Sequence, residues 1–341
     1  MTRNYLITGG AGFIGSNYAQ RLIQRGENVT LFDNLSRAGA PRNVTWLKEQ
    51  FRENAFKLIV GDVRNADQIA DAAKEADVFV HLAGQVAVTT SVTNPRDDFE
   101  ANALGTFNAL EAARLSQRDP IFIYSSTNKV YGGMDDVELI EEATRWLYKD
   151  LAKGCAESQA LDFHSPYGCS KGTGDQYVRD YARIYDLRSV VFRQSCIYGP
   201  RQFGVEDQGW LAWMTIAAVT GKQITIYGDG KQVRDVLHVY DLLNGYDAAI
   251  EKIDHAKGQV YNMGGGTRNL LAIWTEFGPI LEKLLGKKIE VARGDWRPGD
   301  QRVFYADYSK AKKELGWEPK IDLEEGVEML FNWVKENRDL F

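Results

Sequence analysis

The chain has 341 residues, of which 44% are hydrophobic and 26% charged, and this length is sufficient for one large core and a smaller second lobe. A formal net charge of −6, without a run of lysine or arginine, argues against nucleic acid and anionic membrane surfaces as partners. No apolar stretch is long enough to span a bilayer, and the N-terminal residues read directly into a strand, so we expect a cytoplasmic protein.

The first predicted element is a short apolar strand at residues 5–7, followed by a glycine-rich turn and a helix over 16–25. Gly9 allows the tight turn, Gly12 lets the backbone approach a pyrophosphate, and Gly15 lets the helix pack closely on the strand. The free N–H groups and the macrodipole at the start of the helix favour an anion there. This order predicts a dinucleotide-binding unit.

The second predicted strand, residues 29–32, ends in Asp33, about twenty residues after the glycines. A carboxylate at this point can accept hydrogen bonds from the ribose hydroxyls and repels a 2′-phosphate, so we expect NAD as the cofactor. Arg37 lies just past the strand and could receive such a phosphate, which leaves NADP as the alternative.

Further apolar strands alternate with helical stretches, which predicts a Rossmann-like, doubly wound parallel α/β sheet with helices on both faces. These strands are expected at residues 56–60, 78–80 and 121–124. In such a sheet the ligand crevice lies outside the carboxyl ends of the strands, which suits Asp62 for adenine and Ala83 and Gly84 for close approach of the cofactor. His81 is expected to be a core histidine, and the helix around residues 102–106 to pack on the sheet.

Tyr167 and Lys171 form a Tyr-x-x-x-Lys pair after the strand that ends at Thr127, and helical periodicity puts both on one helix face. Ionising a phenol near pH 7 requires roughly 3 pKa units, or about 4 kcal/mol, from nearby positive charge. Lys171 and an oxidised nicotinamide can supply it, so that Tyr167 removes the proton of a sugar or alcohol hydroxyl while hydride leaves the same carbon. Thr127 would hydrogen-bond that oxygen. Without the dinucleotide unit, a surface tyrosine beside a solvated lysine would be the simpler interpretation.

The second half of the chain carries candidate substrate contacts. The planar guanidinium groups of Arg234 and Arg302 suit phosphate oxygens, and each follows a sequence that predicts a turn, at 229–231 and 298–300. Surface salt bridges are the alternative for these arginines. The acid-rich segment 135–164 is expected to lie over the active site, with a disordered insertion as the alternative.

Other aromatic and apolar residues are expected to build a small lobe that closes over the sugar. Trp210 and Trp213 are expected in a core or interface rather than stacked on a base or sugar. Residues 281–285 and 323–334 are predicted to form helices of this lobe. The cysteines and the four histidines are dispersed without metal-ligand spacing, so we expect no metal site and a reducing compartment.

Motifs spread over the whole chain form a series that chance does not assemble. They occupy residues 8–15, 33–35, 62–63, 81–83, 125–132, 167–171, 198–200, 227–235, 261–265 and 297–302. With this series the chain resembles, nearly from end to end, an extended short-chain dehydrogenase/reductase that modifies nucleotide sugars. The resemblance implies NAD as cofactor, a nucleotide-diphosphate sugar as substrate, and a homodimer or homotetramer.

The resemblance also implies roles for individual residues. The catalytic set is Thr127, Tyr167 as the base and Lys171 as its partner. The cofactor contacts are Gly9, Gly12, Phe13, Ile14, Gly15, Asp33, Asn34, Ser36, Asp62, Val63, Leu82, Ala83, Gly84 and Ser125, together with Tyr167 and Lys171. The substrate contacts are Gln85, Thr127, Cys196, Arg201 and Gln208, with Arg234 and Arg302 on the diphosphate. Residues 1–198 and about 236–263 would form the NAD-binding domain, and about 199–235 and 264–341 the nucleotide-sugar lobe.

Departures from the family pattern indicate the subgroup. A 4,6-dehydratase usually has an Asp-Glu pair directly after the strand-end threonine, where this chain has Asn128 and Lys129, so dehydration is disfavoured. Cys196 stands where the family commonly has asparagine, and is a weaker hydrogen-bonding partner. Segments 81–87 and 126–132, with 161–167, resemble those of the CDP-paratose (CDP-tyvelose) 2-epimerases.

This resemblance implies inversion at C2 of a nucleotide-linked hexose, with a CDP-hexose favoured. The C2–H bond has no adjacent carbonyl and is not acidic, so transient oxidation to a 2-keto sugar and return of the hydride to the other face are expected. A UDP-sugar 4-epimerase, a net oxidoreductase and a non-catalytic NAD-binding protein are the alternatives. The intact set of Thr127, Tyr167 and Lys171 argues against the last of these.

Overall fold

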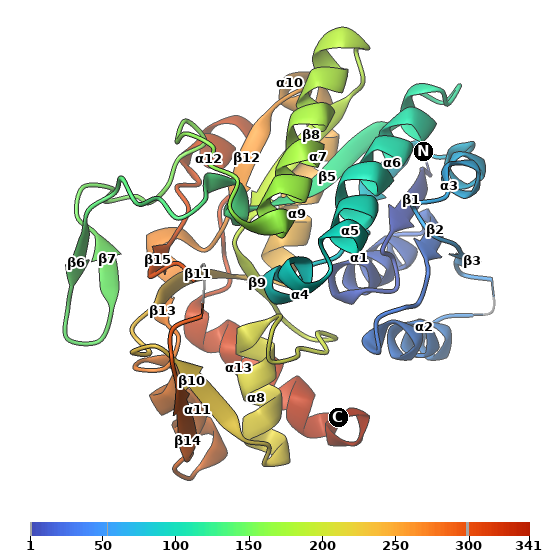
Figure 1. The fold of residues 1–341 in the computed structure, drawn as a ribbon. Coiled ribbons are helices and arrows are strands. Elements are labelled where there is room, and N and C mark those ends of the chain that lie inside the picture. The colour runs from blue at the N-terminus through green and yellow to red at the C-terminus, as the bar shows by residue number, and fades with distance from the viewer. Residues whose placement is uncertain (1, 53, 298–299) are drawn as a thin grey trace.

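The computed structural model describes residues 2–52, 54–297 and 300–341. Its centre is a seven-stranded sheet of order β12-β8-β5-β4-β1-β2-β3 in which every neighbouring pair is parallel. These strands are β1 Asn4–Thr8, β2 Asn28–Asp33, β3 Lys57–Val60, β4 Val78–His81, β5 Ile121–Thr127, β8 Ser189–Gln194 and β12 Val260–Met263. The predicted Rossmann-like, doubly wound α/β fold is confirmed (Figure 1).

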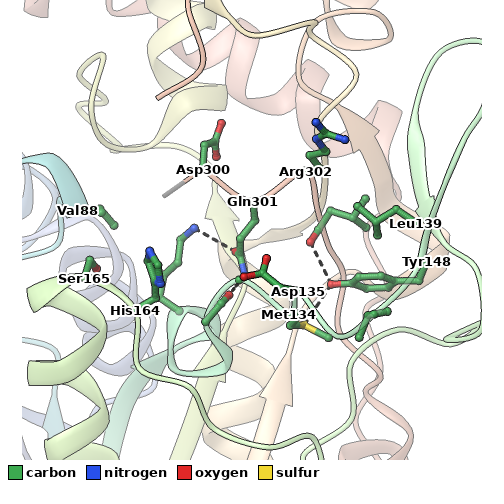
Figure 2. A pocket seen from close by; sticks show the side chains of 15 residues that line it. Val88, Met134, Asp135, Leu139, Tyr148, His164, Ser165, Asp300, Gln301 and Arg302 are labelled. Atoms are coloured by element: carbon green, nitrogen blue, oxygen red, sulfur yellow. Dashed lines mark hydrogen bonds between the residues drawn. The ribbon is translucent and has the colours of Figure 1, made fainter. Parts of the chain in front are cut away.

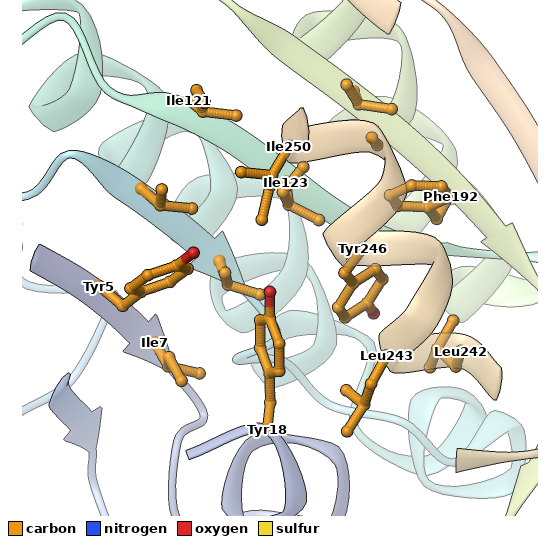
Figure 3. Packing of buried hydrophobic residues seen from close by; sticks show 14 of the residues in the cluster. Tyr5, Ile7, Tyr18, Ile121, Ile123, Phe192, Leu242, Leu243, Tyr246 and Ile250 are labelled. Carbon is orange, nitrogen blue, oxygen red and sulfur yellow. The ribbon is translucent and has the colours of Figure 1, made fainter. Parts of the chain in front are cut away.

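Helices cover both faces of this sheet because alternate strand residues point to opposite sides. On one face, Tyr5 and Ile7 of β1 pack in a cluster with residues of the first and ninth helices, as Figure 3 shows for Tyr18 and Tyr246. On the other face, Leu6 packs in a separate cluster. The helices of the first cluster are α1 Phe13–Gln24, α2 Gly39–Gln50, α9 Val239–Glu251, α10 Ile253–Ala256 and α12 Ser309–Leu315. Those of the second are α3 Ala66–Ala73, α6 Gly105–Arg114 and α7 Ser165–Ile184.

Short helices line the path from β4 to α6. They are α4 Val88–Thr93, α5 Pro95–Phe99 and a π-helical turn over Glu100–Leu104 that leads directly into α6. The helix expected around residues 102–106 is therefore present and packs on the sheet, but its first turn is π-helical. A π-helical turn re-aims the side chains around it, and such turns are frequent at functional sites.

A smaller lobe lies below the sheet in Figure 1. It contains α8 Trp210–Thr220, α11 Phe277–Leu285 and α13 Leu323–Glu336, with β9 Cys196–Tyr198, β10 Ile224–Tyr227, β11 Val233–His238, β13 Leu270–Ala272, β14 Val291–Gly294 and β15 Val303–Phe304. Trp210 and Trp213 pack against its apolar cluster, as expected for core residues. The helices predicted over 281–285 and 323–334 are confirmed as parts of α11 and α13.

The expected division of the chain into two domains stays a prediction. The chain leaves the central sheet after β8 and returns to it through α9 and β12. Residues of α12, however, pack with the face of the central sheet: Ala311 and Leu315 belong to the same cluster as Ile7. None of the described helices combines the length and the apolar character needed to cross a membrane.

The segment over residues 135–164 is ordered and attached to the smaller lobe. It contains an antiparallel hairpin of β6 Leu139–Glu141 and β7 Trp146–Tyr148, which projects at the left of Figure 1. The Tyr148 hydroxyl donates to the carbonyl of Val303 at 3.0 Å, and the Trp146 indole donates to Asp229 at 2.8 Å. A disordered insertion, the alternative interpretation of this segment, is wrong.

Candidate active site

The glycine-rich turn between β1 and α1 has the geometry of an anion-binding loop. Gly9 has φ of +65°, and a Cβ there would lie 2.8 Å from the amide nitrogen of Ala83. A Cβ at Gly15 would lie 2.5 Å from the carbonyl oxygen of Gly9. Gly12 is the N-cap of α1 and has no side chain to accept from the first N–H groups of the helix. The turn can therefore present these N–H groups to a phosphate.

Asp33 lies at the end of β2, directly beside this turn. Its carboxylate is buried and accepts from the backbone N–H groups of Ala11 at 3.0 Å and Leu35 at 2.8 Å. Burial raises the pKa of Asp33, and the two backbone hydrogen bonds oppose that shift. Arg37, the alternative anchor for a 2′-phosphate, donates instead to the side chain of Gln208. The site thus presents a carboxylate, and it fits ribose hydroxyls better than a phosphate.

Phe13 and Ile14 lie in the first turn of α1 and Ser125 lies in β5, whereas the remaining expected cofactor residues outside α7 follow the ends of β2, β3 and β4. Asp62 forms an ion pair with Arg64 at 2.7 Å and accepts from Asn34 at 3.1 Å, and the Arg64 hydrogen bond lowers the pKa of Asp62 to about 2. Asn34 in turn accepts from the backbone N–H of Ser36 at 3.1 Å. A Cβ at Gly84 would lie 2.4 Å from the Asn102 side chain. That glycine therefore leaves room for the Asn102 side chain.

His81 is a core histidine, as predicted. Its ring is completely buried, 2.7 Å from the hydroxyl of Thr8 and 3.1 Å from that of Thr106. Burial lowers the pKa of His81 to about 3. The ring is therefore neutral near pH 7 and is not a candidate acid or base.

The structure brings the three expected catalytic side chains together between the end of β5 and the start of α7. Tyr167 is buried, and its hydroxyl lies near that of Thr127. The Lys171 ammonium donates to the carbonyl oxygen of Ser125 at 2.5 Å and lies 4.4 Å from the centre of the Tyr124 ring. Lys171 is thus directed to the strand end rather than to the phenol.

Burial shifts the pKa values of this pair in opposite directions. It raises the pKa of Tyr167 to about 12, although the Thr127 side chain opposes the shift, and it lowers the pKa of Lys171 to about 8. The expectation that Lys171 lowers the pKa of the phenol is therefore not met by the protein groups alone. Tyr167 is neutral until further positive charge lies beside it.

A cavity of about 450 Å³ opens next to these residues, between the sheet and the smaller lobe (Figure 2). Its walls come from the segment after β5, the hairpin, the start of α7 and the chain around β15. The lining residues are Val88, Lys129, Gly132, Gly133, Met134, Asp135, Val137, Leu139, Tyr148, His164, Ser165, Asp300, Gln301, Arg302 and Val303. The acid-rich segment thus borders the site, as expected.

Lys129 projects into this cavity at a position where a carboxylic acid would serve a dehydratase. Its ammonium donates to the side-chain oxygen of Gln301 at 3.1 Å, and the Gln301 amide donates to the carbonyl of Gly132. Burial, followed by the charge of Arg234, lowers the pKa of Lys129 to about 8. In the sequence, Lys129 is only a departure from the family pattern, and no motif indicates Gln301 as its partner. The 3₁₀ turn that directs Lys129 inward, Asn128–Tyr131, has no clear sequence signal.

Of the two arginines expected on the diphosphate, Arg302 lines the cavity and Arg234 does not. Arg234 is buried in β11 rather than on a turn, and donates to Asp300 at 2.8 Å and to the carbonyl of Gln301 at 2.7 Å. The expected turn position of Arg234 is wrong, because the preceding turn ends before the strand begins at Val233. Arg302 lies 4.9 Å from the ring centre of Trp146, on the hairpin.

The turn expected before Arg302 includes Pro298 and Gly299, which lie outside the described residues. Cys196, in β9, is buried enough that its pKa is raised, and the positive charge of Arg234 opposes that shift. Cys196 therefore lies near Arg234, on β9 of the smaller lobe, and is not among the residues that line the cavity.

Of the seven expected substrate contacts, Arg302 is the one that lines the cavity. Thr127, Cys196 and Arg234 are not among the lining residues, and the other three bond elsewhere. Gln85 donates to the carbonyl of Ala87 at 2.7 Å, and to Asp98 at 3.0 Å. Gln208 accepts from Arg37. Arg201 is buried 4.5 Å from the ring centre of Trp46, and its Nε donates to the side chain of Asn43 at 3.1 Å. Arg201 therefore joins α2 to the smaller lobe, and the structure gives it no role at the sugar.

Comparisons with known proteins agree with this geometry. The family model for GDP-mannose 4,6 dehydratase matches residues 6–330. The chain is 44% identical to CDP-paratose 2-epimerase of Salmonella typhi, over 96% of this chain and 98% of the relative.

Two solved structures match almost the whole chain. The UDP-glucose 4-epimerase of Thermotoga maritima with UDP-glucose has a TM-score of 0.82 and 30% identity, covering 98% of this chain and 99% of that one. DesIV, a dTDP-glucose 4,6-dehydratase of Streptomyces venezuelae solved with NAD bound, has a TM-score of 0.84 and 27% identity, covering 99% and 98%.

Proposed function

The chain belongs to the GDP-mannose 4,6-dehydratase family of extended short-chain dehydrogenases/reductases, and we propose that this NAD-dependent nucleotide-sugar epimerase inverts C2 of a CDP-linked hexose. The reaction is of the CDP-paratose to CDP-tyvelose type. The observation that carries the proposal is Lys129, an ammonium in the cavity beside the proposed catalytic set, where dehydration would require a carboxylic acid. The relative from Salmonella typhi supports the choice of sugar position and base.

The residues around the glycine turn fit NAD. Gly9, Gly12 and the start of α1 would hold the pyrophosphate, Asp33 the adenosine ribose and Asp62 the adenine. The chemistry that NAD supplies when bound is reversible acceptance of a hydride, with a positive charge on the oxidised ring. That charge is the contribution that the Tyr167 phenol requires, since burial is the main cause that holds its pKa at about 12.

Tyr167 is proposed to take the proton of the C2 hydroxyl, while Thr127 holds the same oxygen by a hydrogen bond. Lys171, held against the carbonyl of Ser125, contributes a fixed positive charge at the strand end. The C2–H bond has no neighbouring carbonyl, so direct deprotonation is too slow, whereas oxidation gives a planar 2-keto sugar with two accessible faces. Tyr167 then returns the proton to the oxygen after the sugar has presented its other face.

The sugar must turn over between the two half-reactions while the rest of the substrate stays bound. Arg234 and Arg302 are proposed to hold the diphosphate as a pivot. Arg234 is fixed in place by Asp300 and the backbone of Gln301, and Arg302 lies against Trp146. A cavity of about 450 Å³ is compatible with a hexose and part of the diphosphate.

The test is a panel of CDP-, UDP-, GDP- and dTDP-linked hexoses incubated with purified protein and NAD, followed by sugar analysis. Inversion at C2, strongest with a CDP-hexose and without net NADH, is the expected result. Inversion at C4 of a UDP-hexose would support the alternative that the Thermotoga maritima neighbour suggests. Stoichiometric NADH would indicate a net oxidoreductase, and turnover of none of the sugars would contradict the proposal.

A further inference from the structure

We propose that Asp98, a carboxylate outside the catalytic set, is a positioning residue that fixes the Tyr167–Lys171 turn of α7 and keeps the Lys171 ammonium charged. The inference rests on the acid-base role proposed for Tyr167 and Lys171, but not on which sugar carbon is oxidised. Asp98 lies in α5, directly before the π-helical turn, and its side chain is completely buried.

Three hydrogen bonds surround the Asp98 carboxylate. One oxygen accepts from the Ser170 hydroxyl at 2.6 Å, and the other accepts from the side-chain amides of Gln85 at 3.0 Å and Asn102 at 3.1 Å. Ser170 directly precedes Lys171 in the chain. A short bond from a hydroxyl to a carboxylate is among the stronger hydrogen bonds in proteins. Asp98 therefore ties the catalytic turn of α7 to the loop that follows β4.

All three of these partners are neutral, so the negative charge of Asp98 is not cancelled by its own hydrogen bonds. The other carboxylate near Lys171 is Asp175, on α7, and it forms a buried ion pair with Arg193 of β8 at 2.8 Å. Burial lowers the pKa of Lys171, while Asp175 and Asp98 both raise it. Because Arg193 offsets much of the charge of Asp175, Asp98 is well placed to supply the charge that keeps the ammonium protonated.

The remaining groups that face Lys171 cannot replace Asp98. From β5 they are the Tyr124 ring at 4.4 Å and the Ser125 carbonyl, and from β4 the neutral ring of His81. On α7 itself the remaining titratable neighbour is Tyr167, whose pKa is raised by burial and also by Asp98. Removing the charge of Asp98 should therefore lower the pKa of both Lys171 and Tyr167.

Asp98→Asn removes this charge with little change in shape. The amide oxygen of the new side chain can accept from Gln85 and Asn102, and its nitrogen can donate to the Ser170 hydroxyl. The Ser170 proton can then turn to the carbonyl oxygen of Tyr167, which lies 3.1 Å away. The matched control is Asp97→Asn. Asp97 is the neighbouring carboxylate, but it is 46% exposed and pairs with Arg64.

The first measurement is NMR of [ε-¹³C]lysine-labelled holoenzyme over a pH series, with Lys171→Met to assign the Lys171 signal. This titration needs no sugar substrate. The titration midpoint of Lys171 is expected to fall by about half a pH unit or more in Asp98→Asn and to stay at the wild-type value in Asp97→Asn. An unchanged midpoint in Asp98→Asn would overturn the electrostatic half of the proposal.

The second measurement is the pH profile of kcat with a nucleotide sugar that the wild type converts. Both limbs of the pH profile are expected to move to lower pH in Asp98→Asn, whereas a purely structural role would lower kcat at every pH without moving the limbs.

Ser170→Ala keeps the charge of Asp98 but removes the hydrogen bond between Ser170 and Asp98, so kcat should fall about tenfold with the titration midpoint of Lys171 preserved. Wild-type kcat in Ser170→Ala would remove the positioning half of the proposal. If no sugar is converted but the Lys171 midpoint moves as expected, the proposed function fails and the electrostatic role of Asp98 stands.

Discussion

The cofactor side and the sugar side of the site differ in how far apart along the chain their contacts lie. Around the glycine turn, the contact between Asp33 and Ala11 joins residues only 22 positions apart, although Gly9 of the same turn also approaches the more distant Ala83. In the cavity, Lys129 meets Gln301 across 172 positions. A motif can encode the first kind of contact, because one strand-turn-helix unit brings its residues together. The second kind depends on how the smaller lobe packs on the sheet, so local sequence patterns say little about it.

The proposed catalytic turn lies at the junction of these two sides, and its loss should have the largest effect. Tyr167→Phe removes the proposed base and leaves a ring of nearly the same size in a buried position, so kcat should fall by about 10² or more. NAD affinity and the thermal midpoint should stay close to those of wild type. Steady-state kinetics and calorimetry measure these quantities.

A matched control for that variant is Tyr177→Phe, which changes a tyrosine of the same helix that is 47% exposed. It should leave kcat unchanged. If Tyr167→Phe retained turnover within a factor of about three, the base would have to be another group, and the assignment made from the Tyr-x-x-x-Lys pattern would be wrong.

The sugar side can be tested separately with Lys129→Met. This substitution removes the cavity ammonium and the hydrogen bond to Gln301, and it should lower kcat/KM by about tenfold without changing NAD affinity. Lys149→Met, directly after the hairpin strand β7, is the control because that side chain is 48% exposed and its ammonium is paired with Glu138. A loss of NAD affinity in Lys129→Met would show that the two sides are not independent.

The cofactor side can be tested with Asp33→Ala, which removes the carboxylate proposed to accept from the ribose. The preference for NAD over NADP, measured as a ratio of kcat/KM or of dissociation constants, should fall several-fold. Arg37→Ala should change this ratio less, because Arg37 is already bonded to Gln208. Equal use of NAD and NADP by the wild type would instead indicate that Arg37 binds the 2′-phosphate of NADP and that Asp33 does not set the cofactor preference.

The smallest expected effect concerns Asp62. Arg64 holds the pKa of Asp62 in the folded state at about 2, which is below the ordinary pKa of an aspartate. The charged carboxylate therefore stabilises the fold at any pH above that ordinary pKa. This stabilisation is lost as the pH falls from the ordinary pKa toward 2. The pair is partly exposed, so the contribution is less than about 1 kcal/mol. Asp62→Asn should lower the free energy of unfolding by this amount at pH 7, and the difference from wild type should shrink below about pH 4. A difference that is constant with pH would mean that the ion pair does not cause it.

The features that could be predicted from the sequence are those encoded by residue patterns within a short stretch of the chain. The strand positions, the glycine turn and the role of His81 as a core residue follow from alternation, spacing and apolar context, and the structure confirms them. The position of Arg234 within a strand was not predicted, because a turn sequence just upstream obscured where β11 begins.

The contacts of Arg201 and Asp98 were not predicted for a different reason. Arg201 meets Asn43 across 158 positions, and Asp98 meets Ser170 across 72. No local pattern distinguishes a buried, bonded carboxylate from a solvated one, and the surrounding residues 95–100 read as an ordinary charged helix. The π-helical turn at Glu100–Leu104 could not be predicted from the sequence either. It differs from an α-helix only in that each hydrogen bond spans one more residue.

The most direct test of the account is the fate of deuterium placed at C2 of the nucleotide sugar. If Tyr167 and bound NAD oxidise C2, the label should slow turnover and return to C2 of the product, and product formed in deuterium oxide from unlabelled substrate should carry almost no deuterium there. Oxidation at C3 would make the C2 proton acidic, and solvent deuterium would then appear at C2. Substantial solvent label at C2 would contradict oxidation at that carbon even if Tyr167 and Lys171 proved essential.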